Sequence, residues 1–147
     1  MQVLIDNRQN RRKMPLKRIQ RAAKAILNAL ECPEGELSIV IVDDPQIAEL
    51  NARYLNRQGP TNVISFPMRE GEFSDISPDL LGDVVISADT AQKEADDQET
   101  TLEKRFNELL IHGILHLFGY DHEKDETRAS EMEEKSRALL EIIEKST

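Results

Sequence analysis

Tryptophan is absent from this sequence of 147 residues, aromatic residues make up only 4% of it, and it contains a single cysteine. The core must therefore be built mainly from Leu, Ile, Val and Ala. Cys32 cannot form a disulfide within the chain, as is usual in a reducing compartment. No apolar run approaches the roughly 20 residues of a membrane-spanning helix, and the first residues lack the basic and apolar regions of a signal peptide. We therefore expect a cytoplasmic protein without membrane contact.

Positive charge is scarce overall but concentrated at one end of the chain. The sequence has 19 Lys and Arg against 28 Asp and Glu, a formal net charge of -9. Residues 1–30 nevertheless hold eight basic residues and one acidic residue, a net charge of +7, and the other 117 residues hold 11 basic and 27 acidic residues, a net charge of -16. Such a basic segment either binds RNA or an acidic surface, or forms the solvated face of a helix. The net charge does not choose between these interpretations.

Strand and helix patterns interleave early in the chain, and helices dominate late. Short apolar runs at 3–5, 37–42, 63–66 and 83–87 are typical of strands. Periodicity and capping residues indicate helices at 15–30, from 44 to the turn at 56–60, at 88–99, at 101–116 and from about 125. Pro15 is expected as the first residue of its helix, Asp44 as an N-cap, and 69–79 as an exposed loop. This order predicts one domain over 1–147 with an α+β fold, a small mixed β-sheet packed with about five α-helices.

All three histidines fall within eleven residues of one another. His112 and His116 are four apart, so on a helix their imidazoles lie on one face, where both can bind one ion. Gly119 can adopt the left-handed conformation that ends a helix, which lets His122 approach the same point. Three imidazoles that leave one position for water are typical of catalytic zinc, which lowers the pKa of that water to about 7. We therefore predict one Zn²⁺ per chain, bound at a helix end by His112, His116 and His122.

Other interpretations of the histidines are open at this point. The two helical histidines can instead be satisfied by hydrogen bonds, and His122 can be a surface residue. Imidazole also binds iron, copper and nickel, so zinc is inferred from the open three-ligand geometry. The spacing H-x-x-x-H-x-x-G-x-x-H also occurs in metzincin proteases, where a Glu after the first His is the general base. Here that residue is Gly113, so a peptidase of that kind would lack its proton acceptor.

The segment 112–122, H-G-I-L-H-L-F-G-Y-D-H, resembles the signature of the YbeY-type bacterial endoribonucleases. The segments 60–67, P-T-N-V-I-S-F-P, and 81–87, L-G-D-V-V-I-S, are similar to two further segments of that family, and the resemblance covers essentially the whole chain. It implies a compact α+β fold, one zinc ion bound by three histidines, and cleavage of single-stranded RNA. It also implies 16S rRNA 3′-end maturation and ribosome quality control, with the small ribosomal subunit, ribosomal protein S11 and the Era GTPase as expected partners.

One departure from the family falls at 54–58. The family usually has Y-R-x-K-D there, and its arginine is considered important for RNA cleavage, whereas this sequence has Y-L-N-R-Q. Leu55 occupies the position of the arginine. Arg57, at the family's lysine position, can contact the same phosphate because a planar guanidinium suits a phosphodiester. We therefore expect His112, His116 and Arg57 to be the catalytic residues, the alternative for Arg57 being a solvated loop residue.

Four further polar residues are candidates for the site, each with a structural alternative. Asp83 and Asp121 can orient a metal ligand or accept a proton, or can be turn or capping acids. Asn62 and Ser65 can line the RNA cleft, or can form internal hydrogen bonds. Two other functions also remain open: a metalloprotease or amidase that uses the same zinc, and a noncatalytic ribosome-assembly factor that zinc stabilises and whose basic helix at 15–30 binds RNA.

Overall fold

The computed structural model describes residues 2–68, 79–120 and 126–146. In chain order the described elements are β1 (Gln2–Asn7), α1 (Leu16–Ala29), β2 (Glu36–Val42), α2 (Asp44–Leu55), β3 (Val63–Pro67), β4 (Leu80–Ser87), α3 (Ala88–Asp97), α4 (Leu102–Leu117) and α5 (Glu126–Ser146). The predicted α+β fold, a small mixed sheet with five helices, is confirmed. None of the helices in the described ranges combines the length and the apolar composition needed to cross a membrane.

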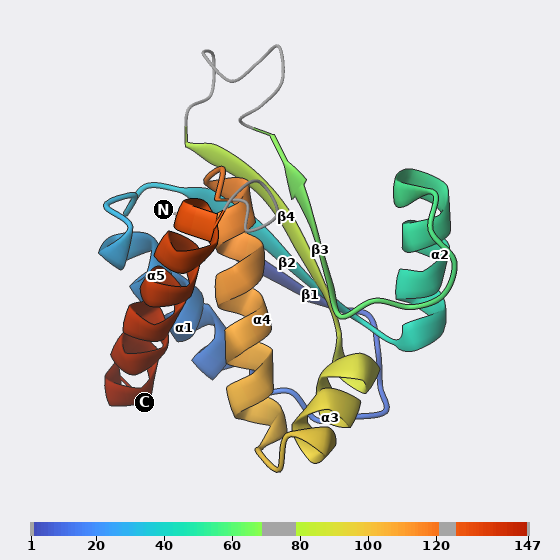
Figure 1. Cartoon of the computed structure of the whole chain (residues 1–147). Helices are drawn as coiled ribbons and strands as arrows, with labels where there is room; N and C mark the ends of the chain where they lie inside the picture. Colours follow the sequence, from blue (N-terminus) through green and yellow to red (C-terminus); the bar gives the residue numbers. More distant parts are fainter. Residues whose placement is uncertain (1, 69–78, 121–125, 147) are drawn as a thin grey trace.

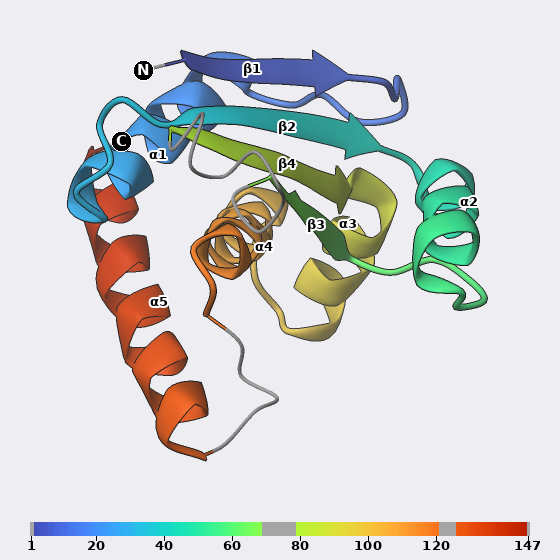
Figure 2. The same ribbon diagram turned by 90° about the horizontal axis from the view of Figure 1, so that it is seen from above.

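The sheet has the strand order β1-β2-β4-β3 (Figures 1 and 2). β1, β2 and β4 are parallel to one another, and β3 pairs antiparallel with β4. Helices α1, α4 and α5 lie on one face of the sheet and α2 lies on the other (Figure 2). Because side chains alternate between the faces of a strand, each sheet residue is assigned to the α4 side or to the α2 side.

The main core lies between the sheet and the helices α1, α4 and α5. Its fully buried side chains include Ile39 and Ile86 from the sheet, Ile26 from α1, and Phe106 and Leu110 from α4. A smaller cluster lies under α2 on the other face and consists of Val42, Ile47, Ile64 and Val85. Helix α4 is therefore held against the middle of the sheet by the larger of the two cores.

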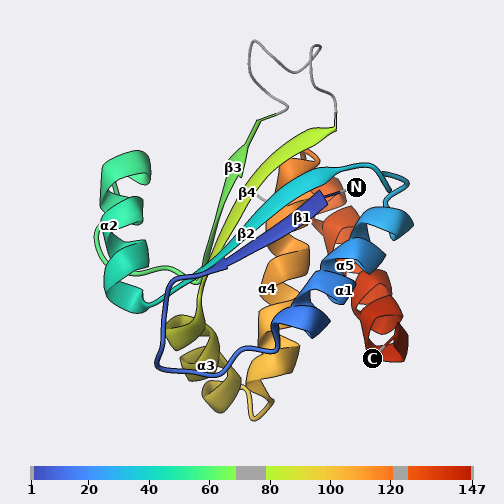
Figure 3. The ribbon, with the colours of Figure 1, turned by 180° about the vertical axis from the view of Figure 1, so that it is seen from behind.

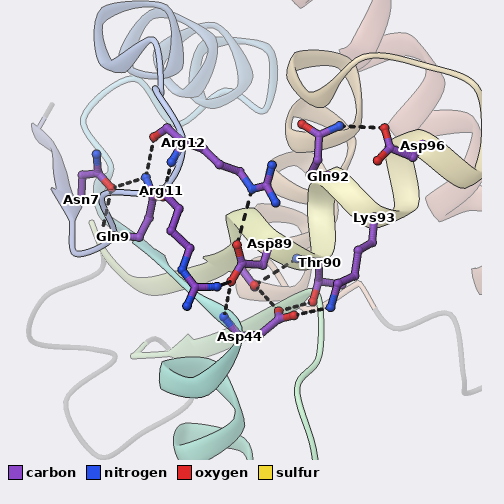
Figure 4. Close-up of polar contacts among 11 residues, drawn as sticks. Asn7, Gln9, Arg11, Arg12, Asp44, Asp89, Thr90, Gln92, Lys93 and Asp96 are labelled. Atoms are coloured by element: carbon purple, nitrogen blue, oxygen red, sulfur yellow. Dashed lines mark hydrogen bonds and ion pairs between the residues drawn. The ribbon is translucent and has the colours of Figure 1, made fainter.

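Two acids, the buried Asp89 and the half-buried Asp44, lie where the parallel strands β1, β2 and β4 end (Figure 4). The Asp44 carboxylate accepts hydrogen bonds from the hydroxyls of Ser87 and Thr90 and from Lys93 Nζ at 2.8 Å. The Asp89 carboxylate accepts a hydrogen bond from the backbone N–H of Asp44 at 3.0 Å. It also forms ion pairs with Arg11 and Arg12, at 3.5 and 3.4 Å. This network ties the basic segment after β1 to the first turns of α2 and α3.

Some predicted element ends differ from the structure by one residue. Pro15 is the N-cap of α1 and not its first helical residue. The N-cap of α2 is Asp43, whose side chain accepts a hydrogen bond from the Gln46 N–H, so the prediction of Asp44 as the cap was wrong. Asp44 lies in the first turn instead, where its carboxylate is available to the side chains of α3. Residues 69–78 of the predicted loop lie outside the described residues.

Candidate functional site

Helix α4 carries the two histidines that the sequence singles out. It starts at the N-cap Thr101, whose side chain accepts a hydrogen bond from the Lys104 N–H at 3.1 Å. It ends after Leu117, and Gly119 has φ of +92°, in the left-handed region that glycine adopts without strain. This is the helix end that the sequence predicts.

The imidazoles of His112 and His116 converge on one face of α4. Their Nε2 atoms lie 3.0 Å apart, the ring centroids lie 4.6 Å apart, and both residues are half-buried. Two nitrogens bound to one tetrahedral zinc ion at about 2.0–2.1 Å lie about 3.3 Å from each other. The pair therefore fits two positions of a zinc ion closely. A hydrogen bond between one protonated and one unprotonated Nε2 fits the same distance.

The third predicted ligand lies outside the described residues, as does its neighbour Asp121. Within the described ranges, no group of three histidine, cysteine or acidic side chains is placed to hold a metal ion. The prediction that His122 completes the site with His112 and His116 therefore stays a prediction.

At Gly113, between the two histidines, α4 packs closely against β3 and β4. A Cβ atom there would lie 2.5 Å from Val84 Cγ1 and 3.2 Å from Val63 Cγ2. On β3, the Ser65 hydroxyl donates a hydrogen bond to the Gly113 carbonyl at 2.8 Å. A side chain larger than hydrogen at 113 would push the helix off the sheet. Position 113 faces the core, so it offers no room for the general base of a metzincin.

A pocket of about 310 Å³ lies between α4 and α5 and reaches His112. Its polar lining includes Asn62, Arg105, Glu108 and Arg137. Arg105 is held by two carboxylates, at 2.9 Å from Glu94 and 3.0 Å from Glu108. Substrate groups that enter this pocket would therefore meet both His112 and a guanidinium that two carboxylates hold in place.

Arg105 and Glu108 were not singled out from the sequence, although a spacing signal was present. Glu108 lies four residues before His112, and Arg105 three residues before Glu108, so all three lie along one face of α4. That spacing alone does not distinguish a cleft from a solvated helix face, and the distinction requires the position of α5.

The other candidates are distributed over both faces of the sheet. Ser65 and Asn62 both form internal hydrogen bonds. The Ser65 hydroxyl donates to the Gly113 carbonyl, and Asn62 Nδ2 donates to the Glu94 carboxylate, whose two oxygens lie 3.2 and 3.3 Å away. Asp83 pairs in register with Phe66, whose ring contacts Tyr54 of α2 at 5.6 Å between centroids. Asp83 is thus exposed on the α2 side, and the structure does not bring it to the histidines.

Arg57 lies in the connection between α2 and β3 and is exposed. Its N–H donates a hydrogen bond to the Asn51 carbonyl at 3.2 Å, after Asn56 turns the chain with φ of +54°. No contact between Arg57 and either histidine is found among the described residues. Its guanidinium also forms no ion pair with a described residue.

Comparisons with known proteins agree with the sequence signature. The profile of the family described as Endoribonuclease YbeY matches residues 4–144. The chain belongs to the YbeY family. The Endoribonuclease YbeY of Geobacter sulfurreducens is 48% identical over 145 residues, covering 98% of this chain and 97% of the relative. The YbeY protein of Aquifex aeolicus is 45% identical over 129 residues, covering 88% of this chain and 81% of the relative.

Among solved structures, the solution structure of a Thermotoga maritima protein has a TM-score of 0.68 at 26% identity. The match covers 96% of this chain and 88% of that one. Membership of the YbeY family, expected from three sequence segments, is thus confirmed over nearly the whole chain. The fold described above is shared with that solved structure over 96% of this chain.

Proposed function

We propose that this YbeY-family chain is a zinc-dependent endoribonuclease that cuts single-stranded RNA, with one Zn²⁺ bound by His112, His116 and His122. The observation that carries the proposal is the convergence of two imidazole Nε2 atoms, 3.0 Å apart, in a chain whose relatives are named endoribonucleases. The pocket beside His112 supports it, because a substrate needs access to the metal from one side.

Each residue has a defined task in this proposal. His112 and His116 hold the metal on one face of α4, and Ser65 and Gly113 fix that turn of the helix against the sheet. When bound, zinc would lower the pKa of a water molecule to about 7 and act as a Lewis acid toward the phosphodiester. Arg57 binds a phosphate oxygen and offsets the charge that develops there. Arg105, fixed by two carboxylates, orients RNA in the pocket next to His112.

The cellular task belongs to the same proposal. We infer that the RNA is the 16S rRNA precursor, whose 3′ end is matured, and that the chain acts in ribosome quality control in the cytoplasm. The small ribosomal subunit, ribosomal protein S11 and the Era GTPase are the proposed partners. These assignments are supported by the resemblance to the YbeY signature, whereas the catalytic assignment is also supported by the histidine geometry.

The first experiment compares metal content and RNA cleavage in the wild type and in His116→Ala. Lys104→Ala, an exposed substitution on the same helix, is the control, and circular dichroism checks folding. We expect about one zinc per wild-type and control chain, cleavage of single-stranded RNA by both, and loss of both properties in folded His116→Ala. Wild-type protein that binds zinc and leaves RNA intact would instead favour the noncatalytic assembly factor. A protease or amidase would need a base near the metal other than residue 113, because Gly113 leaves no room for the metzincin base.

A further inference from the structure

A second pocket, of about 300 Å³, lies between the start of α1 and the first half of α4. The two helices contact each other there, and Figure 3 shows α1 next to α4. The floor of this α1–α4 pocket is apolar, with Ile19, Ala22 and Phe106 each 1–3% exposed. Lys13 and Arg18 stand exposed at its rim. An apolar floor with a cationic rim suits a flat ring that carries a phosphate.

Asn107 adds a polar group without a partner to this pocket. The residue is only 9% exposed, it lines the pocket, and its side-chain amide has no hydrogen bond within residues 2–68, 79–120 and 126–146. Among the described residues, the buried side-chain polar atoms that lack a partner do not include the Asn107 amide, so its polar atoms are accessible from the pocket and open to a ligand. An amide offers a donor and an acceptor side by side, which is the arrangement that pairs with the edge of a nucleobase.

The rim is suited to phosphate for two reasons. Helix α1 has 14 residues, no side-chain cap at its N-terminus and no acidic residue in its first turn, so no side chain of that turn offsets its positive dipole end, and the Leu16 N–H donates only to the Met14 carbonyl. Arg18 pairs with Glu103 at 3.0 Å, but both side chains are well exposed, at 57% and 39%. Such an exposed pair is weak enough for a phosphate to displace the carboxylate.

We propose that the α1–α4 pocket binds one unpaired nucleotide of the RNA, with the base against Ile19 and Phe106, its edge on the Asn107 amide, and its phosphate at Lys13 and Arg18. This inference rests on the proposed RNA substrate. The base must be unpaired, because pairing and stacking would block the edge and the faces that the pocket contacts. Asn107 and His112 are separated by about 7.5 Å along α4 and by about 140° around it. The bound nucleotide therefore anchors the strand at a distance from the reacting phosphate.

The test measures RNA affinity with the zinc-loaded protein. A fluorescent single-stranded RNA made resistant to cleavage by 2′-O-methyl and phosphorothioate groups is titrated by anisotropy at several salt concentrations. We expect Asn107→Ala to weaken binding about fivefold or more with an unchanged salt dependence. Arg18→Ala should weaken binding and lower the slope of log K against log salt by about 0.7. The controls Asn28→Ala, on an exposed part of α1, and Arg53→Ala, paired with Glu49 on α2, should bind like the wild type.

A second variant and an NMR measurement distinguish a loss of RNA binding from a loss of folding in Asn107→Ala. Asn107→Asp keeps the shape of the side chain, loses the donor and adds a charge that repels phosphate, so it should weaken binding at least as much as the alanine variant. In the wild type, RNA should shift the side-chain NH₂ resonances of Asn107.

The possible outcomes separate the pocket from the catalytic site. If the wild type cuts natural RNA and both folded Asn107 variants bind the resistant RNA normally, the pocket proposal is overturned and the proposed function stands. A wild type that neither binds nor cuts RNA overturns the proposed function itself. If adenosine monophosphate alone shifts Asn107 and RNA does not, the pocket takes a free nucleotide, and the assignment to an RNA strand is wrong.

Discussion

Gly113 contributes to the site by having no side chain. It lies between the two histidines where α4 touches β4, and an added Cβ would lie 2.5 Å from Val84 Cγ1. Alanine is intrinsically about 1 kcal/mol more favourable than glycine within a helix. We nevertheless predict that Gly113→Ala lowers the free energy of unfolding by about 1–3 kcal/mol, because overpacking of a rigid core costs more than the propensity gain. Urea unfolding followed by circular dichroism measures this change.

The matched control for Gly113→Ala is the double variant with Val84→Ala. Removing the valine methyl groups makes room for the new Cβ, so the double variant should be more stable than the sum of the two single effects predicts. A Gly113→Ala protein as stable as the wild type would contradict the close approach of α4 to the sheet.

Arg57 is the residue on which the departure from the family pattern can be tested. Its guanidinium is exposed and forms no ion pair within the described ranges, so replacing it should leave stability unchanged within about 0.5 kcal/mol. We predict that Arg57→Ala slows RNA cleavage about tenfold or more, because a cation that offsets developing charge is lost. Arg53→Ala, which removes an arginine already paired with Glu49, is the control.

Leu55→Arg in the Arg57→Ala background tests the same idea in reverse. It restores an arginine at the position where the family usually has one, and cleavage should recover. Equal cleavage rates for the wild type and Arg57→Ala would show that Arg57 is only a solvated loop residue.

Helices α2 and α3 are joined at their first turns by the Asp44 carboxylate. Burial of Asp44 raises its pKa. The hydrogen bonds from Lys93, Ser87 and Thr90 together lower the pKa by more than burial raises it, so the pKa of Asp44 lies below its ordinary value of 3.8. A carboxyl whose folded-state pKa is depressed contributes stability above its unfolded pKa, and that contribution is lost as the pH falls through the folded pKa. We therefore predict that Asp44→Asn costs about 1–3 kcal/mol near pH 7 and progressively less as the pH falls below 3.8.

Urea unfolding of the wild type and Asp44→Asn from pH 7 down to about pH 2 measures this difference. Asp6→Asn is the control, because its ion pair with Arg8 is exposed and should contribute at most about 1 kcal/mol. A stability difference that stays constant or grows on acidification would contradict the assignment of Asp44 as an ionised carboxylate held by α3.

The elements were predictable from the sequence where the signal is local. Short apolar, β-branched runs located the four strands. The prediction of Thr100 or Thr101 as the cap placed the start of α4 to within one residue, and Gly119 placed its end. The strand order was not predictable, because pairing of β2 with β4 rather than with the nearer β3 depends on contacts between residues distant in sequence. Asp44 rather than its neighbour Asp43 was predicted as the cap of α2, because the partners that engage Asp44, Ser87 at the N-cap of α3 and Lys93 on α3, are distant in sequence.

In the candidate site, too, the features set by local sequence were predictable and those set by contacts between distant elements were not. The histidine spacing predicted the convergence of His112 and His116, because both lie on one helix and their separation is set by its geometry. The pocket that Arg105 and Arg137 line could not be predicted, since it depends on how α5 packs against α4. Asp83 was a candidate because of its sequence context, and only the sheet register shows that it lies on the opposite face from the histidines.

Zinc should stabilise the whole molecule if the histidines bind it. A ligand that binds only the folded state, at a free concentration 100 times its Kd, adds about 2.7 kcal/mol to the free energy of unfolding. For a chain of this length we predict a rise in Tm of about 5–10 °C between chelator-treated and zinc-loaded protein. Differential scanning calorimetry of the wild type and of His116→Ala measures it. The rise should be absent in His116→Ala, whereas Lys104→Ala should behave like the wild type. An equal rise in His116→Ala would mean that zinc binds elsewhere, and the site on α4 would have to be abandoned even if the chain cuts RNA.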